Sequence, residues 1–141
     1  EGYEVSVSAV NALILACGKS GQLGRAFETY EALEHTFGLR PNVHTFNCLM
    51  EACLISGSFD AIFKIREELD ERRIEPDVKT HTLLVRGAMY SRDFALLSET
   101  LESLIQPGKP ISQALLEQID KFLKRFNNNN NNNNPAHTNS H

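Results

Sequence analysis

The feature that most constrains this chain is an internal repeat. When the sequence is shifted by 36 residues against itself, its first part matches the next part at many places in a single frame. The matched pairs include Val7 with Val43, Asn11 with Asn47, Leu13 with Leu49, Ala16 with Ala52, Cys17 with Cys53, and Gly21 with Gly57. A weaker third copy follows 35 residues later. A repeat of this length is one supersecondary unit that cannot bury its apolar side chains alone, so neighbouring copies are expected to stack around one continuous core.

Each unit has the pattern of two helices. In the second unit, two stripes of apolar residues recur at helical spacing. The first contains Phe46, Leu49, Met50, Cys53 and Leu54, and the second contains Phe59, Ile62, Phe63 and Leu69. Gly57 can adopt the left-handed conformation that ends the first helix, and Pro76 cannot continue the second. The sequence therefore predicts an all-α fold, an α-solenoid of helix-turn-helix units.

The period also predicts the organisation of the chain. We expect one unit at 7–42, a second at 43–77 and a degenerate third at 78–111. Residues 1–6 are interpreted as the end of a preceding repeat or a linker, because the chain resembles a piece of a longer protein. Residues 112–126 are expected to form a terminal or capping helix, with apolar side chains at helical spacing. Residues 127–141 are Asn-rich and are predicted to be a disordered tail.

A Gly-Lys-Ser sequence in "CGKSGQLG" (residues 17–24) raises the possibility of a phosphate-binding loop. Such a loop needs another glycine five residues before Gly18, where Leu13 stands, and it follows a strand. The preceding residues have helical periodicity instead, and Gly21 aligns with Gly57. This stretch is therefore predicted to be the turn between the two helices of the first unit.

Composition limits the remaining function classes. The net charge is −4, and residues 43–77 carry eight acids against four bases, whereas residues 78–111 carry three acids against four bases. Net charge therefore neither proves nor excludes an RNA partner. Three cysteines without disulfide spacing indicate a reducing compartment. No apolar run approaches the length of about 18 residues that a membrane span needs, so no membrane association is expected.

The sequence does not favour a catalytic or metal-binding site. His44 and Cys48 lie four residues apart, with Cys53 further on, but both cysteines occupy ordinary core or small-residue places, so no metal site is expected. His81 aligns with Phe46 and is expected to pack rather than to catalyse. No nucleophile–base or paired-acid arrangement stands out. We therefore predict neither an enzyme nor a cofactor.

The second unit, with "VHTFNCLMEACLISGSFD" and a closing "EPD", resembles the pentatricopeptide repeat family. The family's pattern runs roughly V-V-T-Y-N-T-L-I, then a Gly, then a closing Pro-Asp. The tetratricopeptide repeat fits less well, because it has a 34-residue period and a Trp signature and this chain contains no Trp. The resemblance covers residues 7–111 and is degenerate in the third unit, where "IQPGKPI" replaces the usual ending. It implies a right-handed α-solenoid.

The resemblance also implies a function. Members of this family typically bind single-stranded RNA in mitochondria or plastids, and each repeat reads one base with two or three side chains. At the family's reading places, Asn47 and Asp77 imply uracil, and Asn11 and Asn42 imply cytosine. Thr82 implies a purine, but its partner position holds Ile111, which cannot form a side-chain hydrogen bond.

At the family's second place, which usually holds a stacking Val, this chain has Ser8, His44 and Lys79. By resemblance, His44 is expected to stack on a base, and Lys79 to contact a phosphate instead. Lys19 stands where family members often contact the RNA backbone. Ile55 and Tyr90 occupy the same place in the later units.

Two alternatives stay open at this point. Asn11 and Asn47 lie near helix starts, where an Asn side chain can simply bond local backbone. The chain as a whole also fits a scaffold that holds a protein partner or structured RNA within a ribonucleoprotein, such as an organellar ribosome, without reading bases. The weak stacking residues and the net charge favour this second function.

Overall fold

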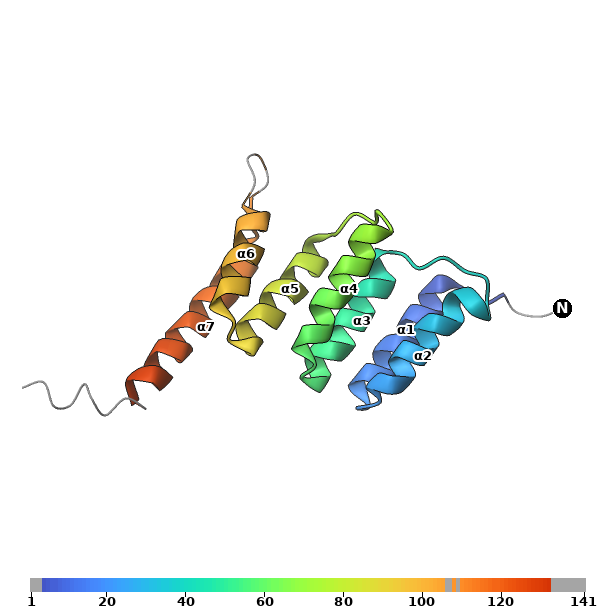
Figure 1. Ribbon diagram of the computed structural model, residues 1–141, viewed down its shortest axis with the longest axis horizontal. Helices are drawn as coiled ribbons and strands as arrows, with labels where there is room; N and C mark the ends of the chain where they lie inside the picture. Colours follow the sequence, from blue (N-terminus) through green and yellow to red (C-terminus); the bar gives the residue numbers. More distant parts are fainter. Residues whose placement is uncertain (1–3, 106–107, 109, 133–141) are drawn as a thin grey trace, which may run out of the picture. The chain divides into compact units, whose positions relative to one another are not determined.

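The computed structural model describes residues 4–105, 108 and 110–132, and all regular secondary structure in this part of the chain is helical (Figure 1). The helices are α1 (Val7–Lys19), α2 (Leu23–His35), α3 (Val43–Ser56), α4 (Phe59–Glu71), α5 (Val78–Ser91), α6 (Phe94–Leu104) and α7 (Gln113–Asn132). The predicted all-α fold of helix-turn-helix units is confirmed. The chain divides into two compact units after Thr100, within α6.

Local sequence explains where several helices of the first compact unit begin and end. Asn42 and Asp77 are the N-caps of α3 and α5, and each accepts a hydrogen bond from the backbone N–H three residues later. At both starts, the hydroxyl of the Thr three residues after the cap accepts a hydrogen bond from the cap's own backbone N–H, which completes a capping box. Gly21 and Gly57 have φ values of 77° and 75°, so both turns within the hairpins use the left-handed conformation that the sequence predicts.

The first helices of successive repeats pack directly on one another. α1 contacts α3, and α3 contacts α5, while α2 and α4 pack beside α3 and α5. The core between them contains Ile14, Leu33, Phe46, Leu49, Met50, Ile62, Leu69 and Leu84, all nearly or fully buried. The apolar stripes predicted for the second repeat, 43–77, therefore pack against the repeats before and after it, as stacked repeats require.

The second helices of the first two repeats are joined by a polar network. The Tyr30 hydroxyl of α2 donates to Glu68 Oε1 of α4 at 2.6 Å, and Arg72, the C-cap of α4, pairs with both Glu34 and Glu68. Burial and the bond to Glu68 together raise the pKa of Tyr30 well above its ordinary value. The Tyr30 ring also meets Phe46 edge-to-face at 5.6 Å, so this network is anchored on the core.

The second compact unit, which begins at Leu101, contains the end of α6 and all of α7. The terminal helix predicted at 112–126 is present, but it runs on to Asn132, so the predicted boundary at Phe126 is too early. Once a helix is nucleated, each further residue adds one hydrogen bond at modest cost, and Asn is only a mediocre helix former rather than a breaker. The rest of the predicted tail lies outside the described residues. Over the described part of the chain, no helix is both long and apolar enough for a membrane span.

Candidate nucleic-acid interface

The predicted reading residues meet at two junctions between consecutive repeats. At the first junction, Asn11 Nδ2 donates to Asn42 Oδ1 at 3.2 Å, and the Thr45 hydroxyl donates to Asn11 Oδ1 at 2.7 Å. Each junction thus joins the fifth residue of one repeat to the N-cap and the third residue of the next.

The second junction repeats this arrangement with one change of residue. Asn47 Nδ2 donates to Asp77 Oδ1 at 3.0 Å, and the Thr80 hydroxyl donates to Asn47 Oδ1 at 2.7 Å. The two junctions therefore have the same hydrogen-bond arrangement, with a neutral Asn cap at the first and an ionisable Asp cap at the second.

The two central asparagines are buried. Asn11 is 6% exposed and Asn47 is 2% exposed, whereas Asn42 is exposed and Asp77 is half-buried. The Thr of the next repeat donates to each of these amides. Each amide also donates to the side chain of a helix cap some 30 residues away rather than to nearby backbone. Each junction uses one donor and one acceptor of its Asn, which is half of that side chain's capacity.

Hydrogen bonding decides the ionisation of Asp77. Burial by itself disfavours the carboxylate, but the Thr80 backbone N–H, the Asn47 amide and the Thr80 hydroxyl all donate to it, and His44 adds a favourable charge interaction. Together these groups hold the pKa of Asp77 below its ordinary value. The second junction therefore contains the negatively charged Asp77 carboxylate, whereas the cap of the first junction, Asn42, is neutral.

This difference predicts that acid weakens the second junction more than the first. A carboxyl group whose folded pKa is lowered stabilises the fold above its unfolded pKa of about 3.9, and that contribution is lost as the pH falls through the folded value. We expect Asp77→Asn to reduce the loss of unfolding free energy between pH 7 and pH 3, measured by urea denaturation. The reciprocal variant, Asn42→Asp, should increase that loss. Equal acid sensitivity in all three proteins would contradict this role for Asp77.

Thr82, from the third predicted reading pair, bonds within its own helix. Its hydroxyl donates to the Val78 carbonyl oxygen one turn earlier in α5, at 2.9 Å. Ile111, the other member of that pair, belongs to the second compact unit. Thr82 is half-buried at the surface of its own helix.

The predicted stacking and backbone residues are solvent-exposed. His44 lies in the first turn of α3, close enough to Asp77 to favour its ionised form. Lys79 Nζ lies 3.1 Å from Glu51 Oε2 on α3, so this cation already has an acidic partner. Lys19 is the exposed last residue of α1. Among the described residues, no cluster of His, Cys, Asp and Glu side chains could hold a metal ion.

Sequence reasoning missed Thr45 and Thr80, which complete the junctions. Their signal was present, because "NVHT" and "DVKT" place a hydroxyl three residues after an Asx cap. The reading places that the family resemblance implies include the asparagines and not these threonines.

Comparison with known proteins shows which family resembles this chain. Residues 41–89 match the sequence model of the PPR repeat family, and residues 1–54 match that of the pentatricopeptide repeat domain. A mitochondrial pentatricopeptide repeat-containing protein of Arabidopsis thaliana is 32% identical over 81% of this chain and 18% of its own length. A chloroplastic one from the same plant is 30% identical over 62% of this chain and 18% of its own length.

An animal relative shows the same partial coverage. The mitochondrial pentatricopeptide repeat-containing protein 1 of Mus musculus is 26% identical over 72% of this chain, and the match covers 15% of its length. The chain thus spans less than a fifth of the length of these relatives.

Proposed function

Because the chain belongs to the pentatricopeptide repeat family, whose members have RNA-related functions in organelles, we propose that it binds single-stranded RNA in a mitochondrion or plastid and reads one base at each junction. The observation that supports this proposal is the repetition of one Asn–Asx pair, in one hydrogen-bond arrangement, at consecutive junctions. A single-stranded RNA offers bases at regular intervals, so a ligand of matching period is the natural partner of such a row.

The orientation of each cap supports a proposal for the base that it reads. At the second junction, the bonds that the Asp77 carboxylate accepts all go to its Oδ1, so its second oxygen is the one left for a ligand. An oxygen accepts the N3–H of uracil. At the first junction, Asn42 Oδ1 is occupied in the same way, which leaves its Nδ2 group to donate to N3 of cytosine. The pair of junctions is therefore suited to a cytosine followed by a uracil.

Exchanging the two caps tests this assignment without dismantling the junctions. Asp77→Asn converts the second junction into the chemistry of the first, and Asn42→Asp does the reverse. We expect Asp77→Asn to change the preferred base at the second site from uracil to cytosine. The relative affinity for the two RNAs should shift by about tenfold, the equivalent of one well-made base contact. NMR titration with short RNAs at low and moderate salt suits an interaction that two repeats alone make weak.

The outcomes separate the possible functions. A reciprocal shift in Asn42→Asp supports reading at both junctions. Equal loss of affinity for all RNAs in both variants would overturn base reading and leave only backbone binding.

The second candidate function is a scaffold within a ribonucleoprotein, which binds a protein or structured RNA by shape. It is favoured by the burial of Asn11 and Asn47 and by the pairing of Lys79 with Glu51, which together withdraw three predicted RNA contacts. Absence of binding to any single-stranded RNA at low salt, in a folded chain, would favour this scaffold function.

A further inference from the structure

One surface of α5 combines basic and aromatic side chains in a way that the junctions do not use. Lys79, Arg86 and Tyr90 are spaced by seven and four residues, which places them on one side of the helix; we refer to them as the α5 stripe. The Lys79 side chain is 57% exposed and Tyr90 is 49% exposed. The Arg86 guanidinium lies 6.0 Å from the centre of the Tyr90 ring, so the cation and the ring form one connected surface.

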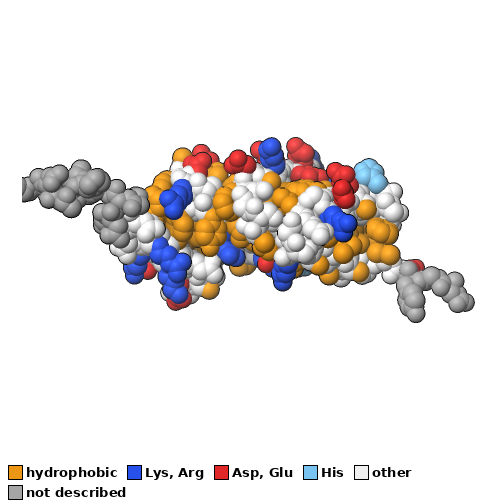
Figure 2. Space-filling view, turned by 90° about the horizontal axis from the view of Figure 1, so that it is seen from below, with side chains coloured by type: hydrophobic (Ala, Val, Ile, Leu, Met, Phe, Trp, Pro, Cys, Tyr) orange, Lys and Arg blue, Asp and Glu red, His pale blue; other side chains and the backbone are white. Residues whose placement is uncertain are grey.

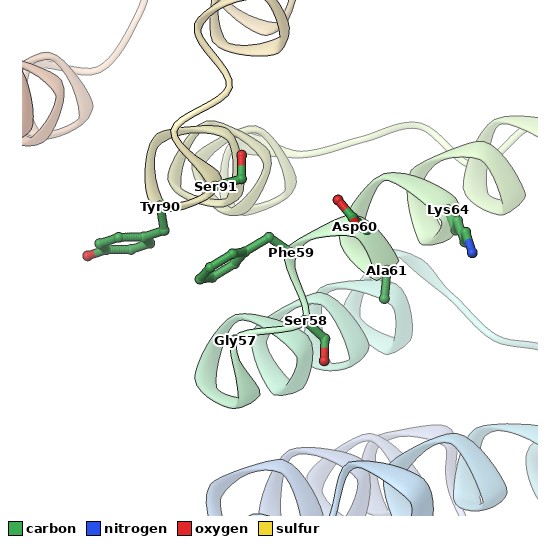
Figure 3. A pocket seen from close by; sticks show the side chains of 8 residues that line it. All are labelled: Gly57, Ser58, Phe59, Asp60, Ala61, Lys64, Tyr90 and Ser91. Atoms are coloured by element: carbon green, nitrogen blue, oxygen red, sulfur yellow. The ribbon is translucent and has the colours of Figure 1, made fainter.

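The aromatic part of the stripe extends onto the neighbouring repeat. The Phe59 ring, at the start of α4, stacks on Tyr90 with 6.1 Å between ring centres. Figure 3 shows the two rings side by side, pointing the same way from α4 and α5. They line an open cleft of about 590 Å³, together with Ser58 and Ser91 and with one acid and one base, Asp60 and Lys64. Figure 2 views the side where the turns within the hairpins lie, and hydrophobic side chains are open to solvent there, with Lys, Arg, Asp and Glu side chains around them.

The place of Tyr90 within its repeat sets it beside two other exposed positions. Lys19 and Ile55 occupy the same place at the ends of α1 and α3, and both are exposed. Tyr90 is the aromatic member of this series, and it lies in the segment where bases outnumber acids. In the same repeat the Thr82 hydroxyl donates to the Val78 carbonyl within α5, whereas Asn11 and Asn47 at the equivalent places bind the cap of the next repeat.

We propose that the α5 stripe is a second RNA-binding site, which holds one nucleotide step without regard to its base. A base stacks on the exposed part of the Tyr90–Phe59 pair, and the adjoining phosphate is bound by Arg86, while Lys79 keeps its ion pair with Glu51 at the other end of the stripe. Exposed aromatic rings beside cations are the usual platform for single-stranded nucleic acid, since every base has a face to stack while only the backbone carries the charge. This inference rests on the proposed function, in that the ligand of the chain is single-stranded RNA. It gives the third repeat a binding role that needs no base reading.

Substitution of Tyr90 tests the stacking contact. We expect Tyr90→Ala to weaken binding of the whole chain by about tenfold on oligouridine, oligocytidine and oligoadenosine alike. Tyr90→Phe keeps the ring and should retain the affinity of the unsubstituted chain. Because Tyr90 is half-exposed, circular dichroism should show the Ala variant folded. Unchanged affinity in a folded Tyr90→Ala variant would overturn the proposal, as would an effect confined to one base.

Arg86 provides an independent readout. Arg86→Ala should flatten the plot of log affinity against log salt concentration by roughly 0.7, the value for one phosphate contact on a single strand, whereas Arg86→Lys should keep the slope. An unchanged slope in Arg86→Ala would overturn the phosphate contact. Tighter binding of oligoglutamate than of RNA would overturn the choice of ligand.

The Asp77→Asn exchange distinguishes this proposal from the proposed function. If Tyr90→Ala weakens binding while Asp77→Asn leaves base preference unchanged, the stripe is an RNA site and base reading fails. If Asp77→Asn shifts the preference while Tyr90→Ala has no effect, base reading stands and the stripe is refuted.

Discussion

Replacement of Gly18 by Ala is expected to destabilise the chain by about 2–3 kcal/mol. Gly18 is buried where α1 crosses α3, and a Cβ atom there would lie 2.5 Å from Ala52 Cβ and 2.8 Å from Ala52 Cα. Carbon atoms in contact prefer separations of about 3.5–4.0 Å. Neither Ala52 atom belongs to a flexible side chain, so the two helices must move apart. This loss exceeds the gain of about 1 kcal/mol that Ala ordinarily brings to a helix interior.

Gly24 in α2 provides the matched control, because nothing lies within 4 Å of a Cβ placed there. Gly24→Ala should be neutral or stabilise the chain by up to about 1 kcal/mol. Urea unfolding of both variants at neutral pH measures the difference. If the two substitutions have the same effect, the close approach of α1 and α3 is not a determinant of stability.

Replacement of Thr80 by Val is expected to cost about 3 kcal/mol. The two side chains have nearly the same shape, so the change removes a hydroxyl and little else. Thr80 is fully buried, donates to Asn47 Oδ1 and accepts from the backbone N–H of Asp77. Its loss leaves a buried acceptor and a backbone donor without these partners, and each such group costs roughly 1–3 kcal/mol.

Thr82 in the same helix is the control for this second substitution. Its hydroxyl bonds only to the Val78 carbonyl within α5 among the contacts described, and the side chain is half-buried. Thr82→Val should change the unfolding free energy by less than about 0.5 kcal/mol. Thermal and urea denaturation of the two variants compare them directly. A Thr80→Val variant as stable as Thr82→Val would mean that the second junction contributes little to the fold.

Much of the fold could be predicted from the sequence because repetition amplifies a weak signal. A single apolar stripe is ambiguous, but stripes recurring 36 and 35 residues apart indicate stacked hairpins and locate their turns. The turn glycines were predicted correctly for the same reason. The end of α7 was not, because an Asn-rich run gives no stop signal, and helix propagation there depends on the helix already formed before it.

The site was predictable only in part. Resemblance paired Asn11 with Asn42 and Asn47 with Asp77, and both pairs are in direct hydrogen bond. Burial of the two central amides was missed, since it depends on how closely the next helix packs and on a Thr rotamer that residue spacing does not specify. The contact between Phe59 and Tyr90 joins different repeats and has no periodic signal in the sequence.

The side-chain amide resonances of Asn11 and Asn47 give the most direct test of base reading. Each amide is enclosed in the free chain and keeps half of its hydrogen-bonding capacity outside the junction. On titration with RNA that contains a cytosine–uracil step, both side-chain signals are predicted to shift in step with binding, and Asp77→Asn should alter the shift at Asn47 alone. Amide signals that stay fixed while the RNA binds elsewhere on the chain would contradict reading at the junctions.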